Sequence, residues 1–135
     1  MKCLDTTYLI DFLSGDPDAI RFASNYDMKS PLVTTELNVF EVLVGIEMVQ
    51  VGKRKREQWK AKAEGLFNRL DVFTLERKGS IKAAEINGEL TRKGVTIDAM
   101  DTLVAGISLS NACNEVVTRN IKHFSKIKDM KVIEY

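Results

Sequence analysis

The chain has 135 residues, of which 44% are hydrophobic, and a formal net charge of +1. This length predicts one domain, residues 1–135, whose core buries roughly two thirds of the unfolded surface. Two prolines and no low-complexity tract argue against long disordered tails. No apolar stretch is long enough to span a bilayer, and acidic residues interrupt the N-terminal segment where a signal peptide needs an apolar core. We therefore expect a soluble cytoplasmic protein that does not associate with membranes.

The predicted elements alternate between short apolar runs and amphipathic segments. In chain order they are a strand at Met1 to Leu4, a helix from Thr6 or Thr7, a helix from Pro17, a strand at Pro31 to Thr35, a helix at Glu36 to Val49 closed by Gly52, a helix at Lys53 to Leu70, a strand at Asp71 to Leu75, helices at Ser80 to Lys93 and Thr96 to Asn111, and strands at Glu115 to Arg119 and Lys131 to Tyr135. Strands without period-two alternation, separated by helices, predict a mainly parallel sheet covered on both faces. The expected fold class is α/β, a three-layer α/β/α domain.

Charged residues and cysteines are unevenly placed along the chain. Residues 1–50 hold 3 basic and 8 acidic groups, whereas residues 51–135 hold 17 basic and 11 acidic groups. The densest basic run, Lys53 to Lys62, is either a solvated helix face or a contact with RNA or protein. Cys3 and Cys113 lie in apolar sequence without CxxC spacing, which predicts buried thiols in a reducing compartment rather than zinc ligands.

Polar groups from distant segments are expected at one edge of the predicted sheet. Asp5 ends the first strand, Asn120 follows a later strand, and Asp101 lies in the first turn of a helix that begins after Gly94. In open parallel sheets, ligands bind beside the carboxyl ends of strands and near helix N-termini. Asp5, Asp101 and Asn120 therefore define a candidate ligand site.

Glu41 is the fourth candidate, because its helix is apolar nearly all round. It shares a stripe with Leu37, Val44 and Met48, which predicts that the acid points inward, where an uncompensated charge costs several kcal/mol. Residues 30–50 contain no basic group. Either a basic residue from elsewhere or a metal ion is expected to meet Glu41. Oxygen ligands without His or Cys favour Mg²⁺ or Mn²⁺ over zinc.

Each candidate also has a structural interpretation. Asp5 is consistent with a strand end or a helix cap, and Glu41 with an interior ion pair. Asp98 is better explained as a helix N-cap than as a ligand, and Asp101 is consistent with a place in the same capping box. None of these interpretations explains why the acids coincide at one edge.

Four segments in this order resemble the PIN-domain ribonucleases, specifically the VapC-type toxins of toxin–antitoxin pairs. They are MKCLDTTYLIDFL, TELNVFEVLVG, KGVTIDAMDTLVAGISL and VVTRNIKHF, and together they extend over nearly the whole chain. The resemblance implies a ribonuclease that hydrolyses RNA with Mg²⁺ or Mn²⁺, with Asp5, Glu41 and Asp101 as metal-binding and catalytic acids and Asp98 as a cap or supporting residue. It also implies a homodimer and a small antitoxin whose tail blocks the acid site.

One position departs from the family pattern. Many members carry an acid where this chain has Asn120, so the catalytic set of Asp5, Glu41, Asp101 and Asn120 contains three carboxylates, and one ion is expected rather than two. Thr6 and Thr118 are interpreted either as positioning water or as capping, and His123 as a structural or surface residue. Trp59 and Phe67 are assigned to packing.

Other classes of protein fit the sequence less well. A phosphoacceptor receiver domain needs paired acids after its first strand, where this chain has LDTT, and an acceptor aspartate after a central strand. A haloacid-dehalogenase-type phosphatase needs DxD at the same place. A PIN-like scaffold that binds RNA without cleaving it is the third alternative, against which the complete set of three acids argues.

Overall fold

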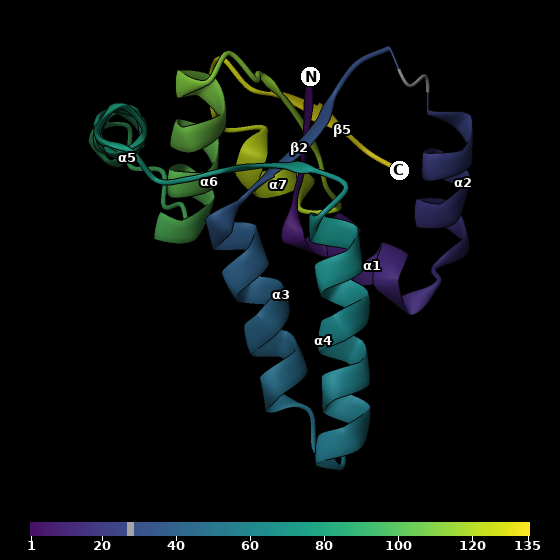
Figure 1. Ribbon diagram of the computed structural model, residues 1–135. Coiled ribbons are helices and arrows are strands. Elements are labelled where there is room, and N and C mark those ends of the chain that lie inside the picture. The colour runs from purple at the N-terminus through teal and green to yellow at the C-terminus, as the bar shows by residue number, and fades with distance from the viewer. Residues whose placement is uncertain (27–28) are drawn as a thin grey trace.

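The computed structural model describes residues 1–26 and 29–135, and within them five parallel strands form one sheet. The strands are β1 (Lys2–Leu4), β2 (Leu32–Thr35), β3 (Asp71–Phe73), β4 (Glu115–Val117) and β5 (Lys131–Ile133), in the spatial order β3-β2-β1-β4-β5. The helices that connect them are α1 (Thr6–Ser14), α2 (Pro17–Asn25), α3 (Glu36–Met48), α4 (Lys53–Phe67), α5 (Arg77–Arg92), α6 (Ala99–Ser110) and α7 (Ile121–Phe124). Figure 1 shows the strands between the α5–α6 pair and the helices α1 to α4.

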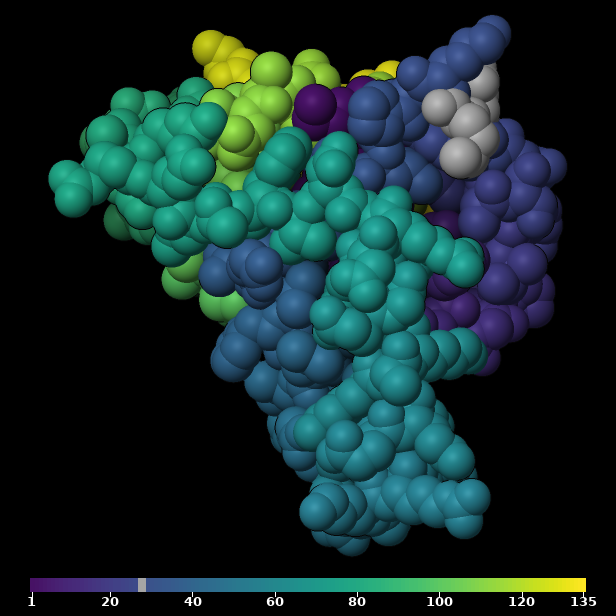
Figure 2. Space-filling model, viewed as in Figure 1, coloured from purple at the N-terminus to yellow at the C-terminus, as the bar shows by residue number. Residues whose placement is uncertain are grey.

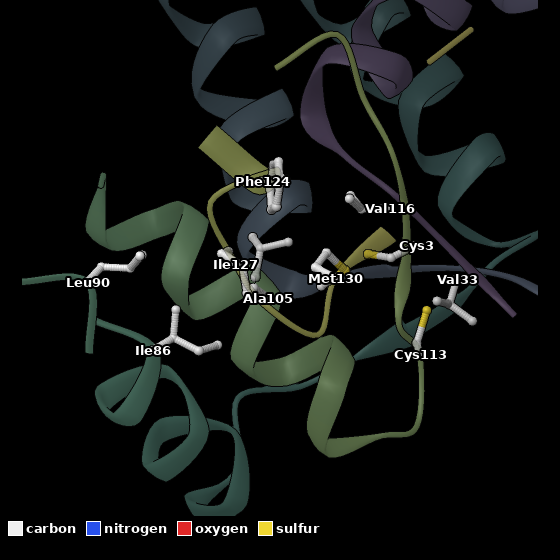
Figure 3. Close-up of a cluster of buried hydrophobic side chains, with 11 residues drawn as sticks. Cys3, Val33, Ile86, Leu90, Ala105, Cys113, Val116, Phe124, Ile127 and Met130 are labelled. Carbon is white, nitrogen blue, oxygen red and sulfur yellow. The ribbon is translucent and has the colours of Figure 1, made fainter. Parts of the chain in front are cut away.

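The two faces of the sheet are covered by different helices. Successive strand residues point to opposite faces. Cys3 and Val116 pack against α5, α6 and the segment around α7, in the cluster drawn in Figure 3. Leu4 and Val117, the next residue of each strand, pack against α1, α2, α3 and α4. The predicted three-layer α/β/α class is confirmed.

The central strand β1 marks the point where the chain changes direction across the sheet. From β1 the chain moves to β2 and β3 on one side, then crosses to β4 and β5 on the other. Asp5 N–H donates to Val117 O across this junction, at 3.1 Å. The carboxyl ends of β1 and β4 therefore flank a topological switch point, where open α/β sheets bind their ligands.

Several element boundaries differ from those predicted. The helix α1 is preceded by Asp5 as its cap position, not by Thr6 or Thr7, and Gly52 caps the start of α4 instead of closing α3. The helix α5 begins at Arg77, before Ser80. The helix α6 begins at Ala99, after Thr96, and the four-residue helix α7 was not predicted. A helix of one turn is too short to show an apolar period.

The helices α5 and α6 pack closely because both carry small residues at the contact. A Cβ added to Gly106 would lie 2.6 Å from Ala83 N and 2.6 Å from Gly79 O. One added to Gly79 would lie 3.3 Å from Ile107 Cγ1. This contact leaves no room for a methyl group at Gly106, and it sets how closely α5 and α6 pack together.

The helices α3 and α4 form a hairpin that projects from the body of the molecule (Figures 1 and 2). Arg56 Nη2 donates to Val49 O and Val51 O, both at 3.2 Å, which ties the turn to the start of α4. Met48 is 75% exposed on this hairpin, so the predicted inward stripe of α3 extends only over its first turns. Lys55 lies over the Trp59 ring, which is half-buried and lines a groove with Ile10 and Val42, in agreement with its predicted packing role.

Three further predictions concern buried groups and membrane association. Cys3 and Cys113 are buried free thiols, as predicted, and burial raises the pKa of Cys3 to about 12. Phe67, the last residue of α4, is buried in the core, in agreement with its predicted packing role. Across residues 1–26 and 29–135, no helix has both the length and the apolar content needed to cross a membrane.

Candidate active site

Asp5 lies at the end of β1, buried, and its carboxylate is held by neutral donors. Thr118 Oγ1 donates to Oδ2 at 2.7 Å, and Thr7 Oγ1 donates to the same oxygen at 3.2 Å. Asn38 Nδ2 donates to Oδ1 at 3.2 Å. Only 4% of Asp5 is exposed, so these hydrogen bonds replace water around the carboxylate without neutralising its charge.

Asn38 connects Asp5 to the neighbouring acid and is a site residue that the sequence did not reveal. It is fully buried at the start of α3, where Thr35 Oγ1 donates to its Oδ1 at 2.7 Å. Its Nδ2 also donates to Thr6 Oγ1 at 3.0 Å, and Thr6 Oγ1 donates to Glu41 Oε2 at 2.5 Å. A continuous hydrogen-bonded chain therefore links Asp5 to Glu41.

Glu41 is half-buried one turn into α3, and its environment disfavours the charged form. Burial is the largest cause of a raised Glu41 pKa, the Thr6 hydrogen bond opposes it, and the charges of Asp5 and Asp101 raise the pKa further. Within the described part of the chain, no lysine or arginine forms an ion pair with Glu41. The alternative of an interior ion pair therefore finds no support among these residues.

Asp101 lies in the first turn of α6, and its side chain is 15% exposed. His123 Nδ1 lies 2.5 Å from Asp101 Oδ2. Burial is again the largest cause of the raised Asp101 pKa, contact with His123 opposes it, and Asp5 and Asp98 add to it. Asp98 accepts a hydrogen bond from Met100 N–H at 2.8 Å, which confirms its predicted place as the N-cap.

The segment from Thr118 to His123 contacts both Asp5 and Asp101. Asn120 N–H donates to Thr118 Oγ1 at 2.8 Å, and Asn120 Nδ2 lies 3.1 Å from His123 Nδ1. Asn120 thus faces the histidine, and no hydrogen bond joins it to a site carboxylate in the described residues. His123 was predicted to have a structural or surface role, and its contact with Asp101 places it at the site. The sequence held one signal for it, a single histidine three residues after Asn120.

Hydrogen bonds through Asn38 and Thr6 link Asp5 to Glu41, and the charges of Asp5 and Asp101 both raise the Glu41 pKa. Among the described residues, no three His, Cys, Asp or Glu side chains are spaced to surround one ion directly. The donor set still fits a hard divalent cation, because Mg²⁺ keeps several water ligands and needs only one or two carboxylates from the protein. The negative charges of these acids at the edge of the sheet would favour the binding of such a cation.

The family is identified by comparison with known proteins. The PIN domain family matches residues 2–130, and the chain therefore belongs to it. This assignment confirms the predicted resemblance and rules out the receiver-type and dehalogenase-type alternatives.

Particular relatives carry VapC names. The chain is 27% identical over 132 residues to the tRNA(fMet)-specific endonuclease VapC of Salmonella typhimurium, a match that covers 98% of this chain and 96% of the relative. It is 29% identical over 136 residues to ribonuclease VapC19 of Mycobacterium tuberculosis, covering 97% and 98%. Its structure is similar to that of DNA-bound VapBC from Salmonella typhimurium, with a TM-score of 0.83, 27% identity and coverage of 98% and 96%.

Proposed function

We propose that the protein is a metal-dependent endoribonuclease and the toxin component of a toxin–antitoxin pair. The observation that carries this proposal is the placement of Asp5, Glu41 and Asp101 near the switch point of a PIN fold, where hydroxyl and amide donors hold Asp5 and Glu41 and His123 contacts Asp101. The names of the similar proteins support RNA as the substrate class.

The cation that fits the site is Mg²⁺ or Mn²⁺. Asp5 and Asp101 would hold it, directly or through water, and Glu41 would complete the site or orient the attacking water. A bound divalent cation supplies Lewis acid chemistry, because it polarises a phosphoryl oxygen and makes water a better nucleophile. Thr118 and Thr7 hold the Asp5 carboxylate in place, and Thr6 does the same for Glu41. Asn120 adds no negative charge, so we expect one ion.

Cleavage of end-labelled single-stranded and hairpin RNA tests this function. The purified protein, freed of any antitoxin, should cut the RNA with Mg²⁺ or Mn²⁺ and not with EDTA. Asp101→Asn should abolish cutting with little change of shape. Cutting that persists in EDTA would refute the metal mechanism. RNA binding without cutting at any metal concentration would instead favour the non-cleaving scaffold.

The antitoxin partner has a candidate docking groove. A groove of about 520 Å³ lies between α1, α3 and α4, and its lining includes Ile10, Val49 and Trp59. Ile10 lies one helical turn beyond Thr6. A partner segment that fills this groove with apolar side chains and carries a basic residue beyond it would match the negative charge of the acidic site. The solved toxin–antitoxin complexes to which the chain is similar support a protein occupant.

A substitution that fills the groove tests the partner. A Cβ at Gly45, which lines the groove, would meet nothing within 4 Å. Gly45→Leu should therefore fold, retain RNA cleavage and lose co-purification with the product of a co-expressed neighbouring short gene. Unchanged co-purification would place the partner elsewhere. The homodimer also belongs to this proposal, and a solution mass of twice 15.2 kDa by light scattering would support it.

A further inference from the structure

We propose that His123 is a positioning residue that holds the Asp101 carboxylate in the orientation needed to bind the divalent cation. The inference rests on the proposed function, because it concerns the same metal site. It assigns a role to the one histidine of the chain, which lies on a helix that the sequence did not predict.

The position of His123 is fixed by the core beneath it. Phe124, the next residue of α7, is fully buried in the cluster of Figure 3, together with Ile127. The His123 side chain remains 43% exposed, while Asp101 is 15% exposed. A well-anchored helix thus presents an imidazole to a mostly buried carboxylate, at 2.5 Å. Because α7 is anchored by the core, the imidazole serves as the fixed partner and restricts the orientation of the Asp101 carboxylate.

The hydrogen-bonding pattern around Nδ1 defines which atom carries the proton. An ionised Asp101 can only accept, so His123 Nδ1 must donate. Asn120 Nδ2 lies 3.1 Å from the same nitrogen, and two donors cannot bond to each other. A half-turn of the Asn120 amide brings its Oδ1 to that place, where it accepts the same proton. In that orientation Asn120 supports the imidazole tautomer that Asp101 selects, and this contact does not require Asn120 to bind metal.

The contact leaves one carboxylate oxygen available. His123 engages Oδ2, and across residues 1–26 and 29–135 no side chain or backbone group donates a hydrogen bond to Asp101 Oδ1. Hydrogen bonds to a metal-binding carboxylate restrict its orientation, and their loss typically costs 10–100-fold in metal affinity. If His123 instead competed with the cation for the carboxylate, the contact would lower metal affinity, and its removal would raise it.

Mn²⁺ binding to the full chain, followed by the electron paramagnetic resonance signal of free Mn²⁺, separates these possibilities without RNA or cleavage. His123→Phe keeps the ring shape and removes both nitrogens. Its Kd for Mn²⁺ should rise by about 10–100-fold. His123→Asn retains a donor at the place of Nδ1 and should recover most of the affinity. Lys122→Ala, an exposed neighbour on the same helix, serves as the matched control and should bind as the wild type does.

Each outcome decides between the proposals. If His123→Phe bound Mn²⁺ with wild-type affinity, the positioning role would be overturned. Tighter binding would overturn it too, and would show that His123 competes with the cation. If Asp101→Asn also bound Mn²⁺ unchanged, the proposed metal site itself would be wrong and the inference would fall with it. If Asp101→Asn lost binding while His123→Phe kept it, only the inference would be wrong. Should His123→Phe fail to fold, His123→Ala supplies the same comparison.

Discussion

Gly106→Ala is a sharp test of how α6, the helix that carries Asp101, is held in place. The added Cβ would lie 2.6 Å from Ala83 N and Gly79 O, and 2.7 Å from Ala83 Cβ. Ordinary contacts between such atoms are about 3.5–4.0 Å, so α5 and α6 must separate by about 1 Å. Because two of the three atoms are backbone, the cost should reach about 3 kcal/mol, the upper end for overpacking.

The higher helix propensity of alanine offsets part of this cost. Replacing glycine by alanine within a helix stabilises it by about 1 kcal/mol, so the free energy of unfolding should fall by about 2 kcal/mol in total. With about 2.1 cal/mol/K of unfolding entropy per residue, this loss lowers the Tm of a 135-residue protein by about 7 °C. Thermal melts followed by far-UV circular dichroism measure the shift.

Gly88→Ala is the matched control, because Gly88 lies in α5 and its added Cβ would meet only the flexible end of Arg92, at 3.4 Å. It should gain about 0.5–1 kcal/mol and raise the Tm by about 2–4 °C. A Gly106→Ala protein that melts at or above the wild-type temperature would refute the close-packing argument.

Four further predictions test two of the acids and the basic residues at the start of α4. Asp98→Asn should keep both stability and cleavage, since asparagine caps helices as well as aspartate, and lost cleavage would move the metal role to Asp98. The raised Glu41 pKa means that its contribution to stability is complete below its ordinary value of 4.5 and is lost as pH rises through the folded-state value. In EDTA, Glu41→Gln should flatten this part of the pH–stability profile from thermal melts, and an unchanged slope would contradict the assignment. Lys53→Ala with Arg54→Ala should reduce the salt dependence of RNA binding by roughly 0.7 per lost phosphate contact, without changing the Tm. Arg56→Ala should lower the Tm, because Arg56 holds the hairpin turn.

The expected positions of Asp5, Glu41 and Asp101 follow from local rules in the sequence. Asp5 ends an apolar run, Asp101 falls in the first turn of a helix, and Glu41 sits on an apolar helix without a basic neighbour. Strand ends and helix starts meet at one edge of a parallel sheet, so their convergence could be inferred from chain order.

The residues that support the acids could not be predicted in the same way. Asn38 contacts Asp5 across 33 positions, and His123 contacts Asp101 across 22. No periodicity within a segment encodes such pairs, which depend on how the strands and helices align in space. The same limit applies to Gly106, whose close contact with Ala83 exists only once α5 and α6 have packed.

The supporting groups of the site have a consequence for the order in which ligands arrive. Hydroxyl and amide donors orient Asp5 and Glu41 but leave their charges in place. A cluster of anions repels a phosphodiester, and this repulsion is strong where water is excluded. Under the proposed function, the cation must therefore bind before the RNA or together with it. Monovalent salt should weaken RNA binding in the usual way, whereas low concentrations of the divalent cation should strengthen it.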